Sequence, residues 1–313
     1  MKKTSVGGQA VIEGVMMKNG NRCATAVRKP DHKIEVKITN HTSIADQYPF
    51  LKLPILRGMV NFVESMVAGM KTLTYSASFF DDEEEEESKF DQWFERTFKD
   101  KGESILIGIT VVIAIFMSIG IFMVLPYLMT GFLERWIHSR TIVLILEGVV
   151  RISIFLIYLL LISRMKDIQR VFMYHGAEHK TINCLEAGVP LTPENVKEYS
   201  RLHKRCGTSF LFIVMFISIF FFFFIRVDHI LLKVACRLLL IPVIAGVSYE
   251  FIRWAGKSDS KLVCIVSKPG MMLQHLTTRE PELDMIEVAI RAVEGVLDWE
   301  AYQEAMRNGE LEE

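Results

Sequence analysis

The sequence predicts a mainly α membrane protein with about four transmembrane helices, a small N-terminal antiparallel β domain and a C-terminal cytoplasmic helix. Two observations predict this fold class. Half of the 313 residues are hydrophobic and the mean hydropathy is positive. These residues also gather in a few long runs, and the charged residues lie between the runs. A soluble chain of this length would distribute its apolar residues over about two domains.

Four runs are long enough to cross a bilayer, which takes about 20 apolar residues in a helix at ~1.5 Å of rise each. They cover residues 105–130, 141–163, 208–225 and 230–252. Lys and Arg then set the orientation, because they concentrate in cytoplasmic loops. Eight of them lie between the second and third runs, and only Arg135 and Arg140 lie between the first two. We therefore expect a multi-pass protein of the cell membrane with both termini and the central loop, 164–207, in the cytoplasm.

Charged residues inside the predicted spans need partners, because a charge in hydrocarbon is costly. Glu147 and Arg151 lie four residues apart on one helical face, and Arg237 of the fourth run lies at a similar depth. Glu147 is therefore expected to pair with Arg151, with Arg237 or with both. A structural ion pair is one interpretation, and a polar cavity or conduction path is the other.

The remaining segments divide the chain into soluble parts. The expected boundaries are an N-terminal β domain (1–50), an amphipathic helix (51–80), an acidic linker with an amphipathic stretch (81–102), the four-span membrane domain (103–253) and a C-terminal segment (254–313). In the β domain, the run 10–17 ends at the turn signal Asn19-Gly20. The early Gly7-Gly8-Gln9 and the Glu13-Gly14 pair suggest a bulge or a close backbone approach.

Two of these parts leave alternatives open. The amphipathic helix fits either the membrane surface or packing against the sheet. In the C-terminal segment, residues 262–266 suggest a short strand, and a final helix is expected from Pro281 to about Met306. The net charge of −1 gives no sign of a nucleic-acid partner. The five cysteines include no C-x-x-C pair, and their number is odd, so the sequence does not favour a disulfide framework.

The most specific chemical pattern is His175-Gly176-Ala177-Glu178-His179, an H-x-x-E-H motif. On a helix, residues four apart share a face, so both imidazoles can reach one divalent metal ion, zinc first. Glu178 then lies where a carboxylate can accept a proton. A solvated helix surface is the plain alternative for a motif of this length.

Three further residues can complete a metal site. His203 and Cys206 lie one helical turn apart just before the third run, and Glu250 ends the fourth run on the same side of the bilayer. One geometric condition applies. A straight helix continuing from residue 163 would carry His175 about 18 Å beyond the membrane edge, so the chain must bend near 164–170 for the two segments to meet.

Three stretches also resemble a known family: residues 7–17, 174–180 and 203–210. On these motifs the chain resembles the YqhQ-like family of bacterial membrane proteins, a family of unknown function. The resemblance implies a metal-dependent enzyme and brings no substrate with it.

The sequence thus favours a metal-dependent hydrolase at the cytoplasmic membrane interface, with Glu178 as catalytic base and a lipid-linked molecule or membrane peptide as substrate. Its metal ligands would come from His175, His179, His203, Cys206 and Glu250. A non-enzymatic scaffold or membrane-protein biogenesis factor is the alternative, in which the cytoplasmic parts dock a partner complex. A transporter that uses the Glu147 cluster is the third and weakest hypothesis.

Overall fold

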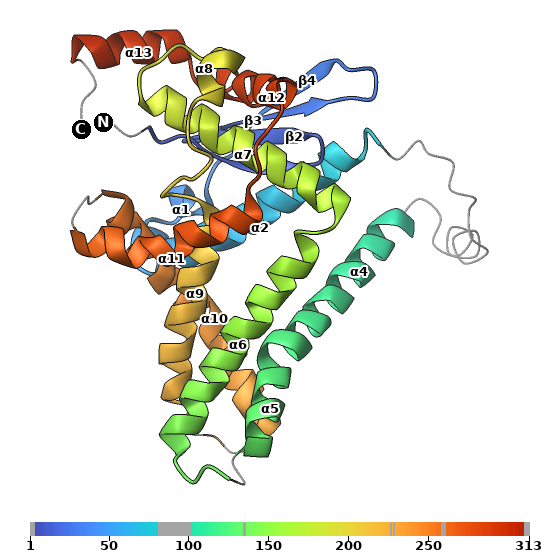
Figure 1. Cartoon of the computed structure of the whole chain (residues 1–313), viewed down its shortest axis with the longest axis vertical. Helices are drawn as coiled ribbons and strands as arrows, with labels where there is room; N and C mark the ends of the chain where they lie inside the picture. Colours follow the sequence, from blue (N-terminus) through green and yellow to red (C-terminus); the bar gives the residue numbers. More distant parts are fainter. Residues whose placement is uncertain are drawn as a thin grey trace. The chain divides into compact units, whose positions relative to one another are not determined.

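A computed structural model of the chain describes residues 4–80, 102–133, 136–225, 227, 229–257 and 261–309. It is mainly helical, with one four-stranded antiparallel sheet near the N-terminus (Figure 1). Most of the predicted acidic linker, residues 81–101, lies outside the described residues. The described chain divides into two compact units. One holds Met1–Phe80, Leu159–Phe222 and Leu239–Glu313, and the other holds Asp81–Tyr158 and Phe223–Leu238.

The sheet has the order β1-β2-β3-β4, with every neighbouring pair antiparallel. Its strands are β1 (Gly7–Val11), β2 (Gly14–Asn19), β3 (Arg22–Arg28) and β4 (Ile34–Asn40). The turn predicted at Asn19-Gly20 joins β2 to β3, with Gly20 at φ 58°. The run 10–17, expected as one strand, is instead split by a turn in which Glu13 adopts φ 49°.

Gly14, which follows this turn, allows β2 to lie unusually close to β3. A side chain at Gly14 would lie 2.3 Å from the carbonyl oxygen of Ala26 in β3, so only glycine lets the two strands approach. The Glu13-Gly14 pair therefore does mark a close backbone approach, as its position in the sequence suggested.

The other regular elements of the described chain are helices. In order they are α1 (Ile44–Gln47), the 3-10 helix η1 (Pro49–Lys52), α2 (Leu56–Ala77), α4 (Gly102–Ile119), the π-helical η3 (Gly120–Val124), α5 (Leu125–Leu133), α6 (Arg140–Ile162), α7 (Lys166–Glu186), α8 (Pro193–Lys197), α9 (Gly207–Phe223), α10 (Ile230–Lys257), α11 (Lys261–Thr277), α12 (Leu283–Glu294) and α13 (Trp299–Asn308). The amphipathic helix expected within 51–80 is therefore present as α2.

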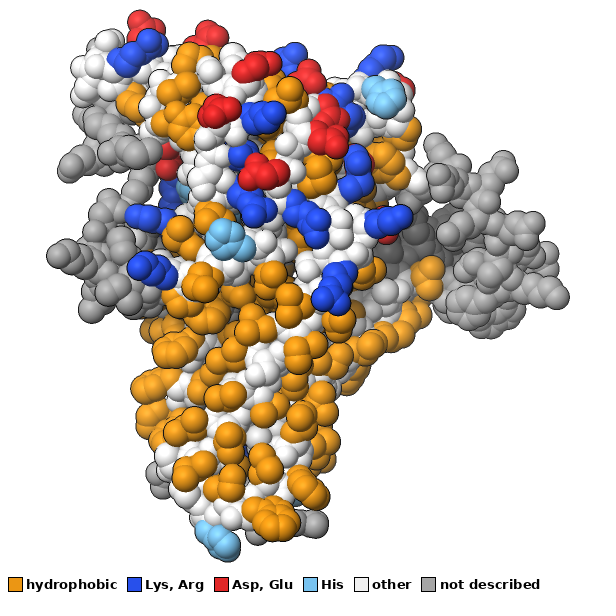
Figure 2. All heavy atoms as spheres, in the orientation of Figure 1, with side chains coloured by type: hydrophobic (Ala, Val, Ile, Leu, Met, Phe, Trp, Pro, Cys, Tyr) orange, Lys and Arg blue, Asp and Glu red, His pale blue; other side chains and the backbone are white. Residues whose placement is uncertain are grey.

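Three of the four predicted spans have the length and composition to cross a membrane: Gly108–Leu133, Thr141–Ile162 and Ile230–Ala255. The fourth prediction needs a correction. The run 208–225 forms α9, an apolar helix of only 17 residues, so the described chain holds three helices of spanning length rather than four. On the face shown in Figure 2, hydrophobic side chains cover the long helices, and charged ones gather over α7, α8 and α12.

The C-terminal segment also departs from the expectation. Residues 262–266 lie inside helix α11 and not in a strand, and the single helix expected from Pro281 to Met306 is two helices, α12 and α13. The β-branched residues of 262–266 favour a strand locally. The chain nevertheless continues this segment as helix for a further eleven residues, and the end of that helix positions the site described below.

One hydrophobic core joins the sheet to α7 and α12. In β2 and β3, alternate residues point to the face that these helices cover: Val15 and Met17, and Ala24 and Ala26. All four are fully buried beside residues of α7 and α12. Segments that are distant in sequence, the N-terminal strands, the centre of the chain and the C-terminal helix, are therefore one folded body.

Candidate metal centre

The H-x-x-E-H motif lies on a helix that starts afresh after the second candidate span. Helix α6 ends at Ile162, and α7 begins at Lys166 after an extended Met165 (φ −72°, ψ 132°). The guanidinium of Arg279 donates to the carbonyl oxygen of Ser163 at 3.0 Å, which fixes the turn. The bend that the sequence required between 164 and 170 is thus present.

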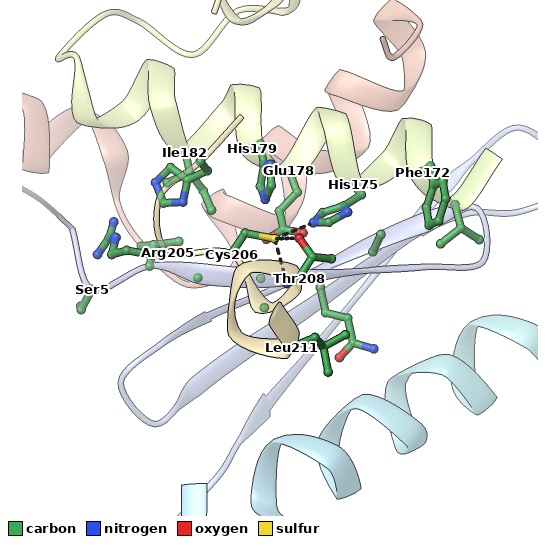
Figure 3. A pocket seen from close by; sticks show the side chains of 18 residues that line it. Ser5, Phe172, His175, Glu178, His179, Ile182, Arg205, Cys206, Thr208 and Leu211 are labelled. Carbon is green, nitrogen blue, oxygen red and sulfur yellow. Dashed lines mark hydrogen bonds between the residues drawn. The ribbon is translucent and has the colours of Figure 1, made fainter. Parts of the chain in front are cut away.

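Three potential ligand atoms meet beside α7. One nitrogen each of His175 and His179 and the Sγ of Cys206 all lie within 4.8 Å of one another. In one of these pairs, His175 Nε2 and Cys206 Sγ lie 3.2 Å apart (Figure 3). Ligand atoms of one zinc ion lie roughly 3–4 Å apart, given Zn–N and Zn–S bonds of about 2.0–2.3 Å. The group therefore fits a metal after a small contraction.

Backbone carbonyls fix the tautomer of both histidines. The Nδ1–H of His175 donates to the carbonyl oxygen of Thr277 at 2.8 Å, and the Nδ1–H of His179 donates to that of Arg201 at 2.6 Å. A carbonyl can only accept, so Nδ1 carries the proton, and Nε2 of a neutral ring keeps its lone pair. Metal-binding histidines are usually held by such a hydrogen bond on the other nitrogen.

His179 shows the consequence most clearly. Its ring is 1% exposed, yet Nε2 has no hydrogen-bond partner among the described residues. Burial lowers the pKa of His179, against the weaker opposite effect of Cys206, and so favours the neutral ring. A neutral imidazole with a buried, unpartnered nitrogen is prepared to bind a metal ion.

Gly176 lets the carbonyl of Thr277 reach His175. After α11 the chain crosses α7 so closely that a side chain at Gly176 would lie 2.0 Å from the carbonyl oxygen of Arg279. The backbone N–H of Arg279 donates to the carbonyl oxygen of Phe172 at 2.8 Å and seals this crossing. Gly176 of the H-x-x-E-H motif thus helps to position His175.

Cys206 stands at the start of α9. The backbone N–H of Thr208 donates to Sγ at 3.4 Å, and the Thr208 hydroxyl lies 3.1 Å from it (Figure 3). The sulfur therefore lies at the N-terminal end of α9, next to His175, where it can serve as a metal ligand.

Glu178 is the carboxylate of the group. It is 5% exposed and its Oε2 has no hydrogen-bond partner within the described part of the chain, whereas the backbone N–H of Gly8 donates to the carboxylate. Burial raises the pKa of Glu178 to about 7, against His175 and the Gly8 hydrogen bond, which lower it. A carboxylate with such a pKa is suited to proton transfer near neutral pH.

A cavity of about 630 Å³ adjoins the group. Its wall includes Gly8 of β1, His175 and Glu178 of α7, Cys206, and Leu211 of α9. This volume lies within the range of small-molecule sites. A small molecule in the cavity would therefore lie next to Glu178 and the three ligand atoms.

Two residues expected as ligands have other partners. His203 lines the same cavity, and its ring centroid is 5.7 Å from that of His179. Its Nε2 lies 3.8 Å from Glu186, however, and His203 is not one of the three grouped residues. Glu250 binds Arg57 of α2 with both carboxylate oxygens, one of them at 2.6 Å, so it is a partner in a salt bridge and does not reach the group. Glu13 also lies outside the group: its carboxylate accepts from Arg170 at 2.6 Å and from the hydroxyl of Tyr174 at 3.2 Å.

Sequence reasoning missed several residues that build the site. Gly8 lies so close to Glu178 that a side chain there would come within 3.0 Å of its carboxyl carbon. The unusual Gly7-Gly8 start gave a signal for this approach, although not for its partner. Gln274 holds the backbone of His203 through two hydrogen bonds of 2.8 Å.

Comparisons with known proteins agree on one family. The family model described as "Protein of unknown function (DUF1385)" matches residues 53–299. The chain is 33% identical over 301 residues to "Uncharacterized protein YqhQ" of Bacillus subtilis (strain 168), covering 95% of this chain and 94% of the relative. No solved structure matches the chain. The chain therefore belongs to the DUF1385 family, which includes YqhQ.

Proposed function

We propose that the protein is a metal-dependent hydrolase that acts at the cytoplasmic surface of the cell membrane. One observation carries the proposal: the buried Nε2 of His179 and the buried Oε2 of Glu178 both lack a hydrogen-bond partner in the described chain, and both residues line the same cavity. Buried polar atoms without partners are rare in folded proteins and call for a ligand that completes them.

Each residue then has a role. His175, His179 and Cys206 hold the metal, and two imidazoles with one thiolate suit zinc and leave a position open. A divalent ion bound there would act as a Lewis acid toward a substrate oxygen. Glu178 accepts a proton at Oε2, and the Gly8 N–H holds its carboxylate toward the cavity.

The proposed membrane placement follows from the shared core. The sheet, α7 and α12 pack together, so they lie on one side of a bilayer. Among the described residues, two candidate spans lie between the sheet and α7, and only one, in α10, lies between α7 and α12. A return to the same side requires an even number of crossings, so we assign the second crossing to α9. Its 17 residues are the lower limit for a span.

We assign this side, together with both termini, to the cytoplasm, because eight Lys and Arg residues lie between α6 and α9 and such residues concentrate in cytoplasmic loops. The cavity then lies at the membrane surface, because Leu211 of the second turn of α9 forms part of its wall. A lipid-linked molecule or a membrane peptide is the substrate class that can reach such a place.

Metal analysis of the full-length chain, purified in detergent without added metal, tests the first step. We expect about one zinc per chain in the native protein and almost none in His179→Ala or Cys206→Ser. Two matched variants should keep the metal: His275→Ala, which removes an exposed histidine of α11, and Cys184→Ser, which removes a buried thiol of α7. Native protein without stoichiometric metal would contradict the proposal.

The chemical step is tested by Glu178→Gln. Removal of a general base lowers the rate by about 10²–10⁴-fold, measured on a panel of fluorogenic lipid esters, lipid phosphodiesters and membrane peptides in liposomes. The variant should retain its zinc. If it keeps the metal and supports full function in cells, the ion is structural, and the scaffold or biogenesis-factor hypothesis replaces the hydrolase.

A second candidate is a cysteine hydrolase without metal. It is favoured by the 3.2 Å contact of Cys206 with His175 Nε2 and by the hydrogen bonds from Thr208 to Sγ, an arrangement that activates a thiol nucleophile. The two candidates separate by alkylation. A metal-free native protein whose Cys206 reacts rapidly with iodoacetamide, more slowly in His175→Ala, would establish the thiol mechanism.

A further inference from the structure

Helix α2 turns its apolar stripe away from the protein. Five large apolar side chains recur at helical spacing and are 42–58% exposed: Val63, Met66, Val67, Met70 and Leu73. The buried positions of the helix are instead Gly58, Glu64, Gly69 and Ser76. A surface helix of a soluble protein shows the opposite arrangement, with its large apolar residues inside.

The inner face of α2 is nevertheless tightly fixed. Gly58 packs on Gly246 of α10 so closely that a side chain there would lie 2.8 Å from its Cα. Phe62 contacts Phe210 in the first turn of α9, with ring centroids 5.9 Å apart. Arg57 binds Glu250. The helix is therefore held across the beginning of α9 and the end of α10.

The segment before α2 and the helix α9 also expose large apolar side chains. Phe50 and Leu53, in and directly after η1, are 60% and 56% exposed. On the other side, α9 exposes Phe216 and Phe220, which lie farther along its apolar length. An apolar surface of this extent marks a contact with a membrane or with a protein partner.

We propose that α2 lies in the membrane interface, with this stripe among the outer acyl chains of the cytoplasmic leaflet. The proposal rests on the membrane placement of α9 and α10 given above. Its own support is the position of α2 across the cytoplasmic ends of these two helices, where a bilayer that surrounds them also meets the stripe. Lys52 and Lys71, at its edges, reach the headgroups.

This placement of α2 also brings the cavity beside Glu178 close to the surface of the bilayer. Gly69 of α2 packs on the side chain of Gln9, and the Ser76 hydroxyl accepts from the backbone N–H of Ile12 at 3.1 Å. Strand β1, which forms one wall of the cavity, is thus attached to α2. A substrate that moves laterally in the membrane then meets the cavity without leaving the lipid surface.

Photolabelling of the full-length chain in liposomes tests the proposal. The liposomes contain phosphatidylcholine, phosphatidylglycerol and a phospholipid with a diazirine in its acyl chain, and adducts are mapped by mass spectrometry. We expect adducts on residues 63–73 as well as on Leu239 of α10, which is 76% exposed. A Val67→Glu/Met70→Glu variant should lose adducts at 63–73 by about tenfold or more, because charged groups then replace two exposed apolar side chains that the proposal inserts among the acyl chains.

A matched variant and the contrary outcomes complete the test. Ser65→Glu adds a charge at an exposed position on the opposite side of α2 and should leave the labelling unchanged. Adducts at Leu239 without adducts at 63–73 would overturn the interfacial helix and leave the membrane placement standing. Absence of both would overturn the membrane placement itself. A stripe that is unlabelled and cross-links to a second copy of the chain would show an oligomer contact instead.

Discussion

Two buried carboxylates of this protein differ in how their charge is compensated. Glu147 on α6 is 4% exposed, and its Oε1 accepts from Arg151 at 2.8 Å and from Arg237 at 2.6 Å. Glu178 on α7 is 5% exposed, and its Oε2 has no partner in the described residues. Both pairings foreseen for Glu147 in the sequence are therefore present.

The difference distinguishes a fully paired cluster from the one to which the proposed function assigns the chemistry. Burying a charge is costly unless it is paired and hydrogen-bonded. Two guanidinium groups offset this cost for Glu147, and a single backbone N–H does so for Glu178. A side chain whose burial is poorly compensated persists where it has a task to perform, so the uncompensated carboxylate is the one to test for chemistry.

Replacing Glu147 or Glu178 by leucine should give the largest difference in the free energy of unfolding between the two clusters. Glu147→Leu leaves two buried guanidinium groups without their carboxylate and should lower the free energy of unfolding by about 3–5 kcal/mol. Glu178→Leu removes a poorly compensated carboxylate and should change it by less than about 1 kcal/mol, or raise it. Unfolding in detergent with a denaturant series measures both. Equal losses would show that the two clusters are equally structural.

Gln274 tests whether the site depends on its backbone supports. Gln274→Leu leaves the buried N–H and C=O of His203 without their partners, which costs about 1–3 kcal/mol for each group. It should also weaken zinc binding by about 10–100-fold, because Cys206 lies on the same segment. Gln303→Leu, equally buried but bonded to Val189, is the control. It should lose stability and keep its zinc affinity.

Two adjacent glycines sharpen the role of Glu178. Gly8→Ala places a methyl group 3.0 Å from the Glu178 carboxyl carbon and 2.7 Å from the Met16 carbonyl oxygen, and should lower stability by about 1–3 kcal/mol. Because it displaces the carboxylate, turnover should fall as well, with zinc retained. Gly7→Ala meets nothing within 4 Å and should behave as the native chain in both measurements.

The sequence predicted the helices and strands of this protein better than the tertiary contacts between them. Long apolar runs identify α6 and α10, and the spacing of Glu147 and Arg151 predicts their pairing, because both signals are local. The strand expected at 262–266 was wrong because packing can override the preference of a short β-branched run. The length of α9 fell short because its run includes residues after Phe223, where the helix ends.

The site divides in the same way. His175, Glu178 and His179 share a helical face by their spacing, and Cys206 was expected near them because of the bend before α7. The carbonyls of Thr277 and Arg201 could not be predicted, since every residue has a backbone carbonyl and only the fold decides which one meets a histidine. The salt bridge of Glu250 with Arg57 could not be predicted either, because Arg57 approaches through the Gly58–Gly246 contact, which no local pattern reveals.

The smallest expected effect concerns Glu186, a second compensated carboxylate, on the same helix as Glu178. Burial alone would raise the pKa of Glu186, but His203, Arg205 and the Thr4 N–H together hold it below its ordinary value of 4.5. Its folded pKa is therefore lower than its unfolded pKa. The stabilisation is present above pH 4.5 and is lost as the pH falls below it, because the unfolded chain then binds the proton first.

Glu186→Gln should accordingly reduce stability near neutral pH and flatten its decline in acid. Thermal unfolding midpoints of the native chain and the variant should converge as the pH falls from about 6 to about 3. A difference that stays constant over this range would mean that the Glu186 charge does not stabilise the fold. Glu147 would then be the one paired carboxylate shown to stabilise the fold. Because Glu147 and Glu178 belong to different compact units, no stabilising carboxylate from the unit of Glu178 would remain for the contrast.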